Sequence, residues 1–547
     1  MYDVHDGSYH VSRPAAHRRR FLSSYPVRVI MLFFWLMTLL LLFTFGVPDS
    51  TRLLDQGIPE EPSDLKVVKL PKGAEIRYRE PGLCETTPGV KSYSGYISLN
   101  ATTNMFFWFF EARTNPQDAP ITLWLNGGPG ADSLLGLFQG NGPCSIDKEL
   151  NEVYNKNSWN NHSNMLYLSQ PLGVGFSYQK KKLGCYDKEA KKWRDCPHPN
   201  GRRADIDPYA YDTTEKAAVT AWEVVQAFFA GLPQLSPSIP KDDVEFHMWG
   251  ESYAGHYSTL FYRYFHEQNL AIANGTAKGT RLNLGTLGIM SGLIDAKIQS
   301  KWYYEFPVNN TYGIKAVNDT IYTFTKQAYE FPNGCRDAIE ACEQADRSDQ
   351  HGRVLCSSAL SICRGLVRGG YESFSGRSVY DMRCQTPCPD RPPTLIPYLN
   401  RARIQRALGV DLNYTTAENS IVARGFGDSG DFAYPDFRAA LEDVLGYGTR
   451  VVLVHGDADF TCNWRGGDEV ARSLRWGGGK EGLFRAARED ELVVNGRARG
   501  AVWEGGGLAF VRVDASGHQV SYFQPEVAQT VFARCVAAQR VSDGGKS

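Results

Sequence analysis

The chain has 547 residues, of which 42% are hydrophobic, and a formal net charge of -1 at pH 7. This is the composition of an ordinary globular protein with a sizeable core, and the length is compatible with one large α/β unit. Because the charge is balanced and no basic domain stands out, the composition argues against a nucleic-acid partner.

The first predicted element is an apolar segment at residues 29–47, which contains no charged side chain. Its length is close to the ~20 residues that cross a bilayer as a helix, and it is longer than the apolar part of a usual cleaved signal peptide. Five arginines precede the segment: Arg13, Arg18, Arg19, Arg20 and Arg28. By the positive-inside rule, this basic flank stays on the cytoplasmic side.

We therefore predict a cytoplasmic tail at 1–28, a single-pass type II signal anchor at 29–47 and a polar, proline-containing stalk at 48–64. The rest of the chain would then be lumenal or extracellular, in a vacuole or at the cell surface. A cleaved signal peptide, which would give a secreted protein, is the alternative.

Twelve cysteines all lie beyond residue 80, which favours an oxidising compartment and disulfide bonds. Asparagine glycosylation needs the same compartment, and six Asn-x-Ser/Thr sequences are candidates for it. They are Asn100, Asn161, Asn274, Asn309, Asn318 and Asn413. The cysteine and histidine spacings do not indicate a zinc site, so we expect no metal and no other cofactor.

Strand-like and helix-like segments alternate along the lumenal part. Two β-rich runs at 93–99 and 105–110 predict a hairpin. Short apolar runs that suit strands buried on both faces of a mostly parallel sheet lie at 121–125, 244–249, 284–290 and 450–455. Helix-like material lies between them, for example at 217–229, so the sequence predicts an α/β fold.

Three segments interrupt this alternation. Residues 293–397 contain six cysteines, and we interpret them as an inserted helical lid held by disulfides. Residues 179–210 form a smaller charged insertion, in which Cys185 and Cys196 are placed to close a local loop. The Gly-, Arg- and Glu-rich residues 477–507 are predicted to be a further surface excursion.

The strongest local signal for chemistry is the sequence Gly-Glu-Ser-Tyr-Ala-Gly at 250–255. A strand-like run precedes it and helix-compatible residues, 258–268, follow it. A serine on a tight strand-to-helix turn is typical of a nucleophile elbow, in which small flanking residues permit the strained turn. Ser252 is therefore a candidate nucleophile, although a single match of this kind is a weak signal.

A serine nucleophile needs a base, and the base needs an acid that fixes its tautomer. Downstream of Ser252, a strand-like run ends in Gly-Asp-Ala-Asp at 456–459, and another, 509–513, ends in a loop that contains His518. The order serine, acid, histidine is that of α/β-hydrolases. Sequence alone does not separate Asp457 from Asp459.

Five blocks, in this order, together resemble the motifs of serine carboxypeptidases, and chain-wide the resemblance is to fungal members. They are Trp-Leu-Asn-Gly-Gly-Pro-Gly at 124–130, the block at 159–178, Gly-Glu-Ser-Tyr-Ala-Gly-His-Tyr at 250–257, Gly-Asp-Ala-Asp at 456–459 and Gly-His at 517–518. The resemblance covers residues 65–540. It implies an α/β-hydrolase with a mostly parallel central sheet flanked by helices, and a serine-type carboxypeptidase that removes C-terminal amino acids from peptides and proteins.

The resemblance also implies roles for individual residues. Ser252 would form the acyl-enzyme, with His518 as base and Asp459 as the acid that orients it. The N–H groups of Gly128 and Tyr253 would form the oxyanion hole. Asn126 and Glu251 would bind the substrate carboxylate, and we expect activity at acidic pH because a protonated carboxyl can donate to a carboxylate.

Three departures from the family pattern bear on these roles. Gly140 stands where the family has a second glutamate, which weakens the expectation of C-terminal specificity. Ala131 and Asp132 replace a Cys-Ser pair, and Gln519 follows His518 where the family usually has methionine.

The resemblance further implies two nested disulfides, Cys335 with Cys363 and Cys342 with Cys356, and a free Cys462 beside the site. The pairing of the other cysteines is left open.

Two other functions remain possible from the sequence. An acyltransferase or esterase would use the same triad, and the loss of the glutamate at position 140 keeps that alternative open. A non-catalytic, membrane-anchored binding protein would not need an intact triad. The sequence does not reveal the oligomeric state.

Overall fold

The computed structural model describes residues 57–388, 394–415 and 417–542. At residues 417–419 it describes the backbone only. Contacts divide the chain into Met1–Leu53 and Leu54–Ser547, and all described residues belong to the second unit. The predicted tail and anchor, and the stalk up to residue 56, lie outside the described residues. Within the described part, no helix is long and apolar enough to cross a membrane.

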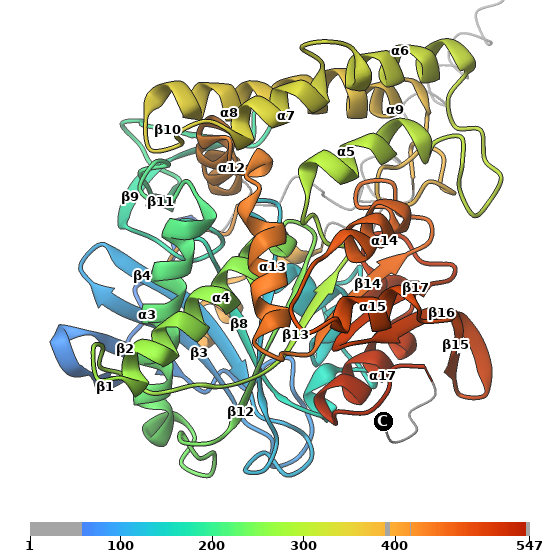
Figure 1. The fold of residues 1–547 in the computed structure, drawn as a ribbon. Coiled ribbons are helices and arrows are strands. Elements are labelled where there is room, and N and C mark those ends of the chain that lie inside the picture. Colours follow the sequence, from blue (N-terminus) through green and yellow to red (C-terminus); the bar gives the residue numbers. More distant parts are fainter. Residues whose placement is uncertain (1–56, 389–393, 416, 543–547) are drawn as a thin grey trace, which may run out of the picture. The chain divides into compact units, whose positions relative to one another are not determined.

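The centre of the second unit is a twelve-stranded sheet (Figure 1). In spatial order its strands are β1 (Lys66–Lys69), β2 (Glu75–Arg79), β3 (Ser92–Asn100), β4 (Thr103–Phe110), β8 (Asn164–Leu168), β5 (Ile121–Asn126), β12 (Glu245–Glu251), β13 (Asn283–Met290), β14 (Val451–Gly456), β17 (Leu508–Val513), β16 (Arg497–Gly505) and β15 (Asp490–Val494). The six neighbours from β8 to β17 are parallel to one another, and the outer pairs are antiparallel. The predicted hairpin is β3–β4, and the four apolar runs are β5, β12, β13 and β14.

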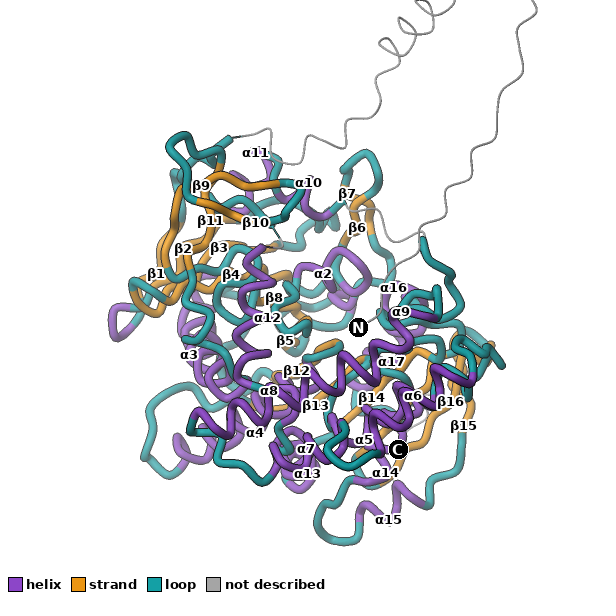
Figure 2. The backbone as a smooth tube through the Cα atoms, turned by 90° about the horizontal axis from the view of Figure 1, so that it is seen from above, coloured by secondary structure: helices purple, strands orange, loops and turns teal. Residues whose placement is uncertain are grey.

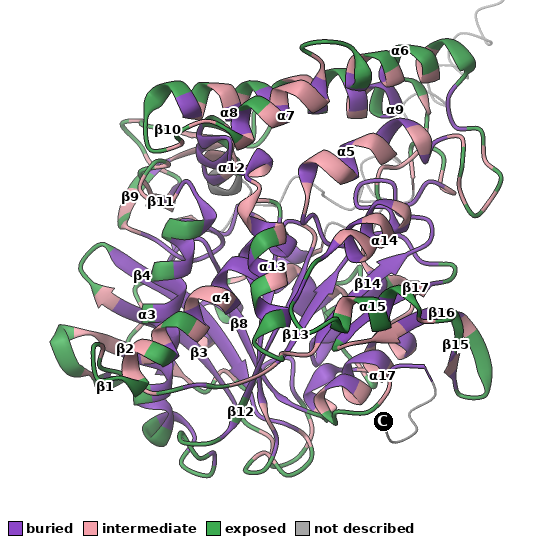
Figure 3. Cartoon of the chain, in the orientation of Figure 1, coloured by how far each residue is buried: buried purple, intermediate pink, exposed green. Residues whose placement is uncertain are grey.

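Helices cover both faces of this sheet, and the strands alternate their side chains between the two cores. Ile121, Leu123 and Leu125 of β5 pack in the core under helices α3, α4, α13 and α14, whereas Trp124 packs in the core under α10, α11 and α17. Because both faces are covered, every residue of β5 is buried, and the central strands of the sheet are coloured mainly as buried (Figure 3). This explains why the strand appears in the sequence as a continuous apolar run.

The helices and helical turns outside the main insertion have these bounds: η1 (Pro71–Gly73), α2 (Leu134–Gly136), η2 (Leu137–Asn141), η3 (Trp159–Asn161), α3 (Thr214–Leu235), α4 (Ala254–Ala273), α10 (Leu395–Leu399), α11 (Ala402–Leu408), α12 (Ala417–Ser429), η5 (Asp431–Ala433), α13 (Asp436–Gly446), α14 (Trp464–Ser473), α15 (Lys480–Arg485), α16 (Val520–Phe523) and α17 (Pro525–Val536). The helix predicted at 217–229 is part of α3. Thr213 caps it by accepting a hydrogen bond from the Lys216 N–H group, as N-cap threonines do.

The segment predicted as a lid is helical. It contains α5 (Ala296–Glu305), α6 (Asp319–Glu330), α7 (Cys335–Glu343), α8 (Gln350–Ile362), η4 (Cys363–Arg368) and α9 (Gly369–Phe374). Two views at right angles show these helices together with α12 above the central sheet (Figures 1 and 2). We call residues 293–397 the helical insertion.

The two nested disulfides expected from the resemblance, Cys335–Cys363 and Cys342–Cys356, are confirmed. They tie α7 to α8 and η4. Such bonds typically stabilise a fold by ~2–4 kcal/mol, chiefly through the unfolded chain. The path of η4 is therefore held by covalent bonds as well as by packing.

Three further disulfides join described cysteines. Cys185–Cys196 closes the loop predicted in the charged insertion, and Cys84–Cys144 and Cys384–Cys388 are pairings that the sequence left open. Two buried cysteines are free, Cys535 and the expected Cys462. The insertion around Cys185 forms a three-stranded sheet of β10 (Lys192–Arg194), β9 (Lys180–Asp187) and β11 (Gly201–Asp205), and a two-stranded sheet pairs β6 (Cys144–Ile146) with β7 (Glu152–Tyr154).

The prediction for residues 477–507 was wrong in part. Instead of a surface excursion, this segment supplies α15 and the last two strands of the main sheet, β16 and β15. β16 pairs with β17 along six residue pairs, and its inner residues Ala501, Val502 and Trp503 are buried. Arg, Glu and Gly residues dominate the exposed parts of this edge and obscured its apolar positions.

Candidate active site

Ser252 lies directly after β12 and before α4, where the chain turns sharply. Its φ angle is 68°, in the left-handed region that costs a non-glycine residue roughly 1–2 kcal/mol. Hydrogen bonds hold the turn: the Ser252 N–H donates to the Met290 carbonyl at 2.9 Å, and the Ser252 carbonyl accepts from the N–H groups of Gly255 and Leu293 at 2.9 and 3.0 Å. The predicted strand–turn–helix geometry is present.

The small residues of the motif are needed for this turn. A Cβ atom at position 250 would lie 2.5 Å from the Cβ of Ala254, and one at position 255 would lie 2.2 Å from the Leu293 carbonyl oxygen. Since Ala254 already carries a methyl group, position 250 has no room for another. Alanine at the fifth position of the motif is therefore compatible with the turn.

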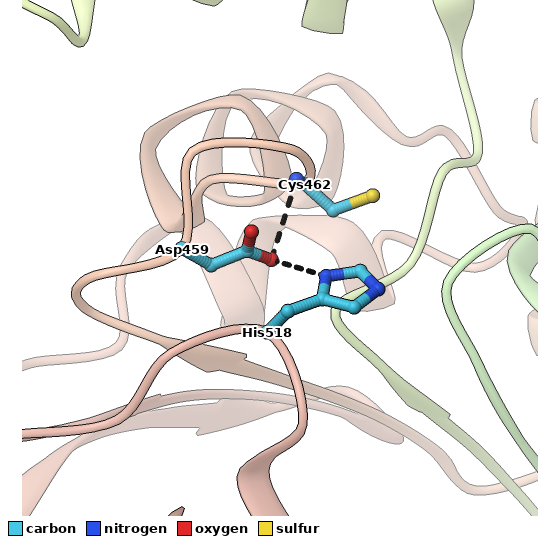
Figure 4. A group of neighbouring side chains, drawn as sticks. All are labelled: Asp459, Cys462 and His518. Carbon is cyan, nitrogen blue, oxygen red and sulfur yellow. Dashed lines mark hydrogen bonds and ion pairs between the residues drawn. The ribbon is translucent and has the colours of Figure 1, made fainter. Parts of the chain in front are cut away.

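His518 and Asp459 form a close pair at the ends of two neighbouring strands. The His518 Nδ1 atom lies 2.7 Å from Asp459 Oδ2, and both side chains are buried (Figure 4). The backbone of His518 is held on two sides, because its N–H donates to the Tyr380 carbonyl at 2.8 Å and its carbonyl accepts from the Ser291 hydroxyl at 2.7 Å. The pair is thus fixed by the helical insertion and by the loop after β13.

Asp457, the other acid of the block, has different partners. It accepts hydrogen bonds from the Tyr312 hydroxyl at 2.7 Å and from the Ser516 N–H at 3.2 Å. Burial raises the pKa of its carboxyl group. The structure therefore separates the two aspartates that the sequence could not: Asp459 contacts the histidine, and Asp457 braces the loop that carries it.

The thiol of Cys462 lies beside this pair. Asp459, Cys462 and His518 bring a carboxylate oxygen, a sulfur and a ring nitrogen within 4.8 Å of one another (Figure 4). The Asp459 carboxylate and the His518 ring are already hydrogen-bonded to each other. Asp459 Oδ2 also accepts a hydrogen bond from the Cys462 N–H at 3.3 Å. Burial raises the pKa of the thiol well above its usual value, which disfavours the thiolate that a metal ion needs. We interpret the cluster as an acid–histidine pair with a neighbouring thiol.

Asn126 and Glu251 are at the carboxyl ends of the neighbouring strands β5 and β12. The Asn126 side-chain amide donates to Glu251 Oε1 at 3.2 Å, and both residues are buried. The Asn126 Oδ1 atom accepts from the Trp124 indole at 2.8 Å and from the Gly136 N–H at 2.9 Å. These bonds fix the amide so that its nitrogen points toward Glu251.

Gly128 and Tyr253, the predicted oxyanion-hole residues, lie on loops that approach each other closely. A Cβ atom at Gly127 would lie 2.2 Å from the Tyr253 backbone nitrogen. Glycine at this position therefore permits the two backbones to meet. Gly128 and Tyr253 both line a cavity together with Ser252.

Two cavities meet at Ser252. The first has a volume of about 400 Å³ and is lined mainly by apolar and small residues, including Tyr253, Leu293, Tyr303 and Phe426. The second has a volume of about 610 Å³ and is more polar. Its lining includes Asn126, Glu251, Ser252, His518, Gln139, Gln519 and the Cys384–Cys388 disulfide. All proposed catalytic and carboxylate-binding side chains except the buried Asp459 therefore face one continuous site.

The helical insertion supplies residues that the sequence analysis did not identify. Arg364 and Arg368 line both cavities, and Tyr380 and Asp381 line the second. These residues belong to no recognisable motif, and their proximity to Ser252 depends on contacts across more than a hundred positions of the chain. A sequence pattern carries no signal for such contacts.

The departure at Gly140 is explained by packing. A Cβ atom at this position would lie 2.4 Å from the Ser521 Cβ and 2.8 Å from the Ser521 carbonyl carbon. No side chain fits there without a shift of α16. The adjacent Gln139 lines the second cavity instead, and its Oε1 atom accepts from Gln519 Nε2 at 3.2 Å.

The departure at Asp132 also has a structural role. Its buried carboxylate accepts from the Ser169 hydroxyl at 2.8 Å and from the Leu134 N–H at 3.3 Å. A Cβ atom at Gly175 would lie 2.2 Å from Asp132 Oδ2. The hydrogen bond from Ser169 therefore joins the loop after β5 to the block at 159–178.

The six candidate glycosylation sites differ in exposure. Asn100, Asn274, Asn309 and Asn318 are exposed, and Asn161 is half-buried. Asn413 is buried, and its Oδ1 atom accepts from the Arg202 N–H at 2.8 Å. Asn413 is therefore the least accessible of the six candidates.

Comparison with known proteins gives a consistent result. The family model described as serine carboxypeptidase matches residues 81–538. The sequence is 36% identical to carboxypeptidase S1 homolog B of Arthroderma otae over 533 residues, which cover 90% of this chain and 80% of that protein. It is 35% identical to carboxypeptidase S1 of Penicillium janthinellum over 465 residues, which cover 85% of this chain and 99% of that protein.

Among solved structures, the fold resembles that of Kex1(delta)p, a prohormone-processing carboxypeptidase of Saccharomyces cerevisiae. The TM-score is 0.61 at 21% sequence identity, and the match covers 82% of this chain and 92% of that chain. At this identity the likeness bears on the fold alone, and it agrees with the α/β-hydrolase fold expected from the sequence.

Proposed function

The chain belongs to the serine carboxypeptidase family and is a serine-type carboxypeptidase, and from this premise we propose that Ser252, His518 and Asp459 carry out its reaction. The observation that supports this assignment best is the buried His518–Asp459 pair, 2.7 Å apart, beside the cavity into which the strained Ser252 turn opens. The three residues come from the carboxyl ends of β12, β14 and β17, where α/β folds place their active sites.

In the proposed mechanism, the Ser252 hydroxyl attacks the carbonyl carbon of the last peptide bond while His518 takes its proton. Asp459 holds the ring with Nδ1–H toward the carboxylate, so that Nε2 serves as the base. The N–H groups of Gly128 and Tyr253 stabilise the oxyanion, which typically accelerates such a step by ~10²–10³-fold.

The intermediate collapses as the C–N bond breaks and His518 gives its proton to the leaving amino group. Water then attacks the acyl-enzyme ester with the same general-base assistance, and the shortened peptide leaves with a new terminal carboxylate. His518 returns each proton that it accepts, so the enzyme ends in its starting state.

We assign the second cavity to the leaving residue and the first to the residue that precedes the scissile bond. Asn126 and Glu251, which would bind the terminal carboxylate, line the second cavity and not the first. The Asn126 amide can donate to a carboxylate, and so can Glu251 when it carries a proton. The family has a second glutamate at the position of Gly140. Without it, Asn126 and Glu251 are the proposed carboxylate-binding pair, and Gln139 lines the same cavity.

Because Glu251 must be protonated to donate, we propose that the enzyme works at acidic pH. The test is the pH profile of kcat/KM for wild type and for Glu251→Gln, whose amide donates at every pH. The variant should keep activity toward neutral pH better than wild type does. An unchanged profile, or a wild-type maximum above pH 7, would contradict the proposal.

The disulfides and the fungal relatives indicate an enzyme of the secretory or vacuolar lumen. We propose that residues 29–47 anchor it as a type II protein, with residues 1–28 in the cytoplasm, 48–64 as stalk and 65–540 as the catalytic domain. Residues 293–397 would act as the lid of that domain, and Asn100, Asn161, Asn274, Asn309 and Asn318 would carry glycans. Alkaline carbonate extraction tests the anchor: the full chain should stay in the membrane pellet, and a chain lacking 1–47 should not.

Peptide digestion followed by mass spectrometry tests the assignment of the carboxylate site. We expect stepwise loss of C-terminal residues from peptides with a free C-terminus, and protection of the same peptides by C-terminal amidation. Intact peptides together with Ser252-dependent cleavage of simple esters would instead indicate an esterase or acyltransferase. That result would mean that carboxylate recognition had been lost with the glutamate at position 140.

A further inference from the structure

The first cavity combines an apolar lining with positive charge. Two arginines of the helical insertion, Arg364 and Arg368, line it, and no aspartate or glutamate is among the described residues that do so. Both arginines also border the second cavity, which contains Glu251 and Asp381. Among the described residues, acidic side chains therefore line only the leaving-residue cavity, whereas the two arginines line both cavities.

The two arginines differ in their partners. Arg368 is largely buried and forms an ion pair with Glu372 at 2.7 Å, so its charge is compensated within the protein. Arg364 is exposed, and the described residues offer it neither an ion pair nor a side-chain hydrogen bond. Its guanidinium group is available to a ligand in the cavity.

The position of Arg364 is well determined by the fold. It follows Cys363, which is bonded to Cys335, and it lies in η4, between α8 and α9 in the chain. Leu360, Arg364 and Arg368 are spaced by four residues, and all three line the first cavity, which shows that this helical face points into it. An arginine held in this way loses less conformational freedom on binding than one on a mobile loop.

We propose that Arg364 makes the enzyme prefer peptides with an acidic residue immediately before the scissile bond. The inference rests on the proposed function, since it uses the first cavity as the site of that residue. A volume of about 400 Å³ accommodates a glutamate side chain. Guanidinium and carboxylate groups form paired hydrogen bonds of complementary geometry, and Leu360 and Tyr303 can contact the methylene groups.

A set of matched dipeptides tests the proposal on the full-length enzyme. The substrates are N-blocked Glu-Leu, Gln-Leu and Leu-Leu, in which Gln has the shape of Glu without its charge. We expect wild type to cleave Glu-Leu about tenfold faster than Gln-Leu in kcat/KM, as one charge-assisted hydrogen-bonded pair would give. Arg364→Gln should bring this ratio to about one, and Arg364→Lys should keep part of it.

The matched control is Arg424→Gln. Arg424 is an exposed arginine on α12 next to Ala423, which lines the first cavity, but Arg424 itself lines neither cavity. The Arg424→Gln variant should leave the ratio of kcat/KM for Glu-Leu to that for Gln-Leu unchanged. Arg364 is exposed, so its replacement should not affect folding, and the thermal unfolding midpoint of each variant checks this independently of activity.

Three results would overturn the proposal. The Glu/Gln ratio could stay unchanged in Arg364→Gln, or all three substrates could lose activity equally, which would assign Arg364 to the terminal carboxylate. Arg364→Gln could also change the preference for glutamate in the leaving position, which a comparison of Leu-Glu with Leu-Gln measures. Cleavage of Leu-Leu by wild type is a separate readout, because its absence would contradict the proposed function and not the role of Arg364.

Discussion

At the scale of single residues, two aspartates in one loop have different tasks. Asp459 accepts from His518, whereas Asp457 accepts from Tyr312 and Ser516. Both are buried and lie two residues apart, so neither burial nor sequence position distinguishes them. The hydrogen-bond partners do, because only the acid in contact with the ring can fix its tautomer.

Asp459→Asn should therefore lower kcat by about 10⁴-fold, since the amide would favour the wrong tautomer of His518. Asp457→Asn is the matched control, and its kcat should stay within about tenfold of wild type. Steady-state kinetics on one peptide compares the two. Equal losses in both variants would contradict the assignment of the orienting acid.

Gly140 illustrates a departure that packing explains. We predict that Gly140→Ala destabilises the enzyme by about 1–3 kcal/mol, because its methyl group would lie 2.4 Å from the Ser521 Cβ. Gly446→Ala is the control, since a Cβ atom there meets nothing within 4 Å. Unfolding midpoints of the two variants decide the matter. A Gly140→Ala variant as stable as Gly446→Ala would show that α16 shifts without cost.

At the scale of secondary structure, the buried strands carry ionisable groups whose titration affects stability. His247 of β12 is buried and its Nδ1 atom accepts from the Thr286 N–H at 2.8 Å. Burial lowers its pKa to about 3, although Glu245 lies 3.7 Å from Nε2. The folded state thus keeps the ring neutral, whereas the unfolded chain protonates it below its ordinary value of ~6.5.

It follows that His247 contributes stability above pH ~6.5 that is lost as the pH falls toward 3. The slope expected from one such group is about 1.4 kcal/mol per pH unit within this window. His247→Gln should flatten the dependence of unfolding free energy on pH between about 6.5 and 4. His351→Gln, at an exposed position on α8, is the control. Parallel curves for wild type and His247→Gln would contradict the argument.

Strands buried on both faces were predictable because their apolar runs are visible without tertiary information. The same holds for the elbow at Ser252 and for the local loop closed by Cys185 and Cys196. β15 and β16 were not predicted, since their apolar positions are interspersed with glycine and charged residues. Arg364 could not be predicted either, because its place beside Ser252 results from the packing of the insertion over the sheet.

At the scale of the whole molecule, the site is assembled from distant segments by one sheet. β5, β12, β14 and β17 are neighbours or near neighbours in the parallel centre, and their carboxyl ends bring together residues from 126 to 518. The helical insertion lies above the central sheet (Figure 2), and its residues Arg364 and Arg368 line the first cavity. The sheet therefore positions the chemistry, and the insertion is where substrate preference is expected to vary.

The proposed mechanism depends on an acyl-enzyme that forms on Ser252 during removal of C-terminal residues. The most direct measurement is to treat the full-length enzyme with a fluorophosphonate, locate the adduct by mass spectrometry, and assay peptide trimming before and after. We expect one adduct, on Ser252, with loss of trimming in proportion to labelling and no trimming by Ser252→Ala. An adduct on another residue, or trimming that persists in Ser252→Ala, would contradict it.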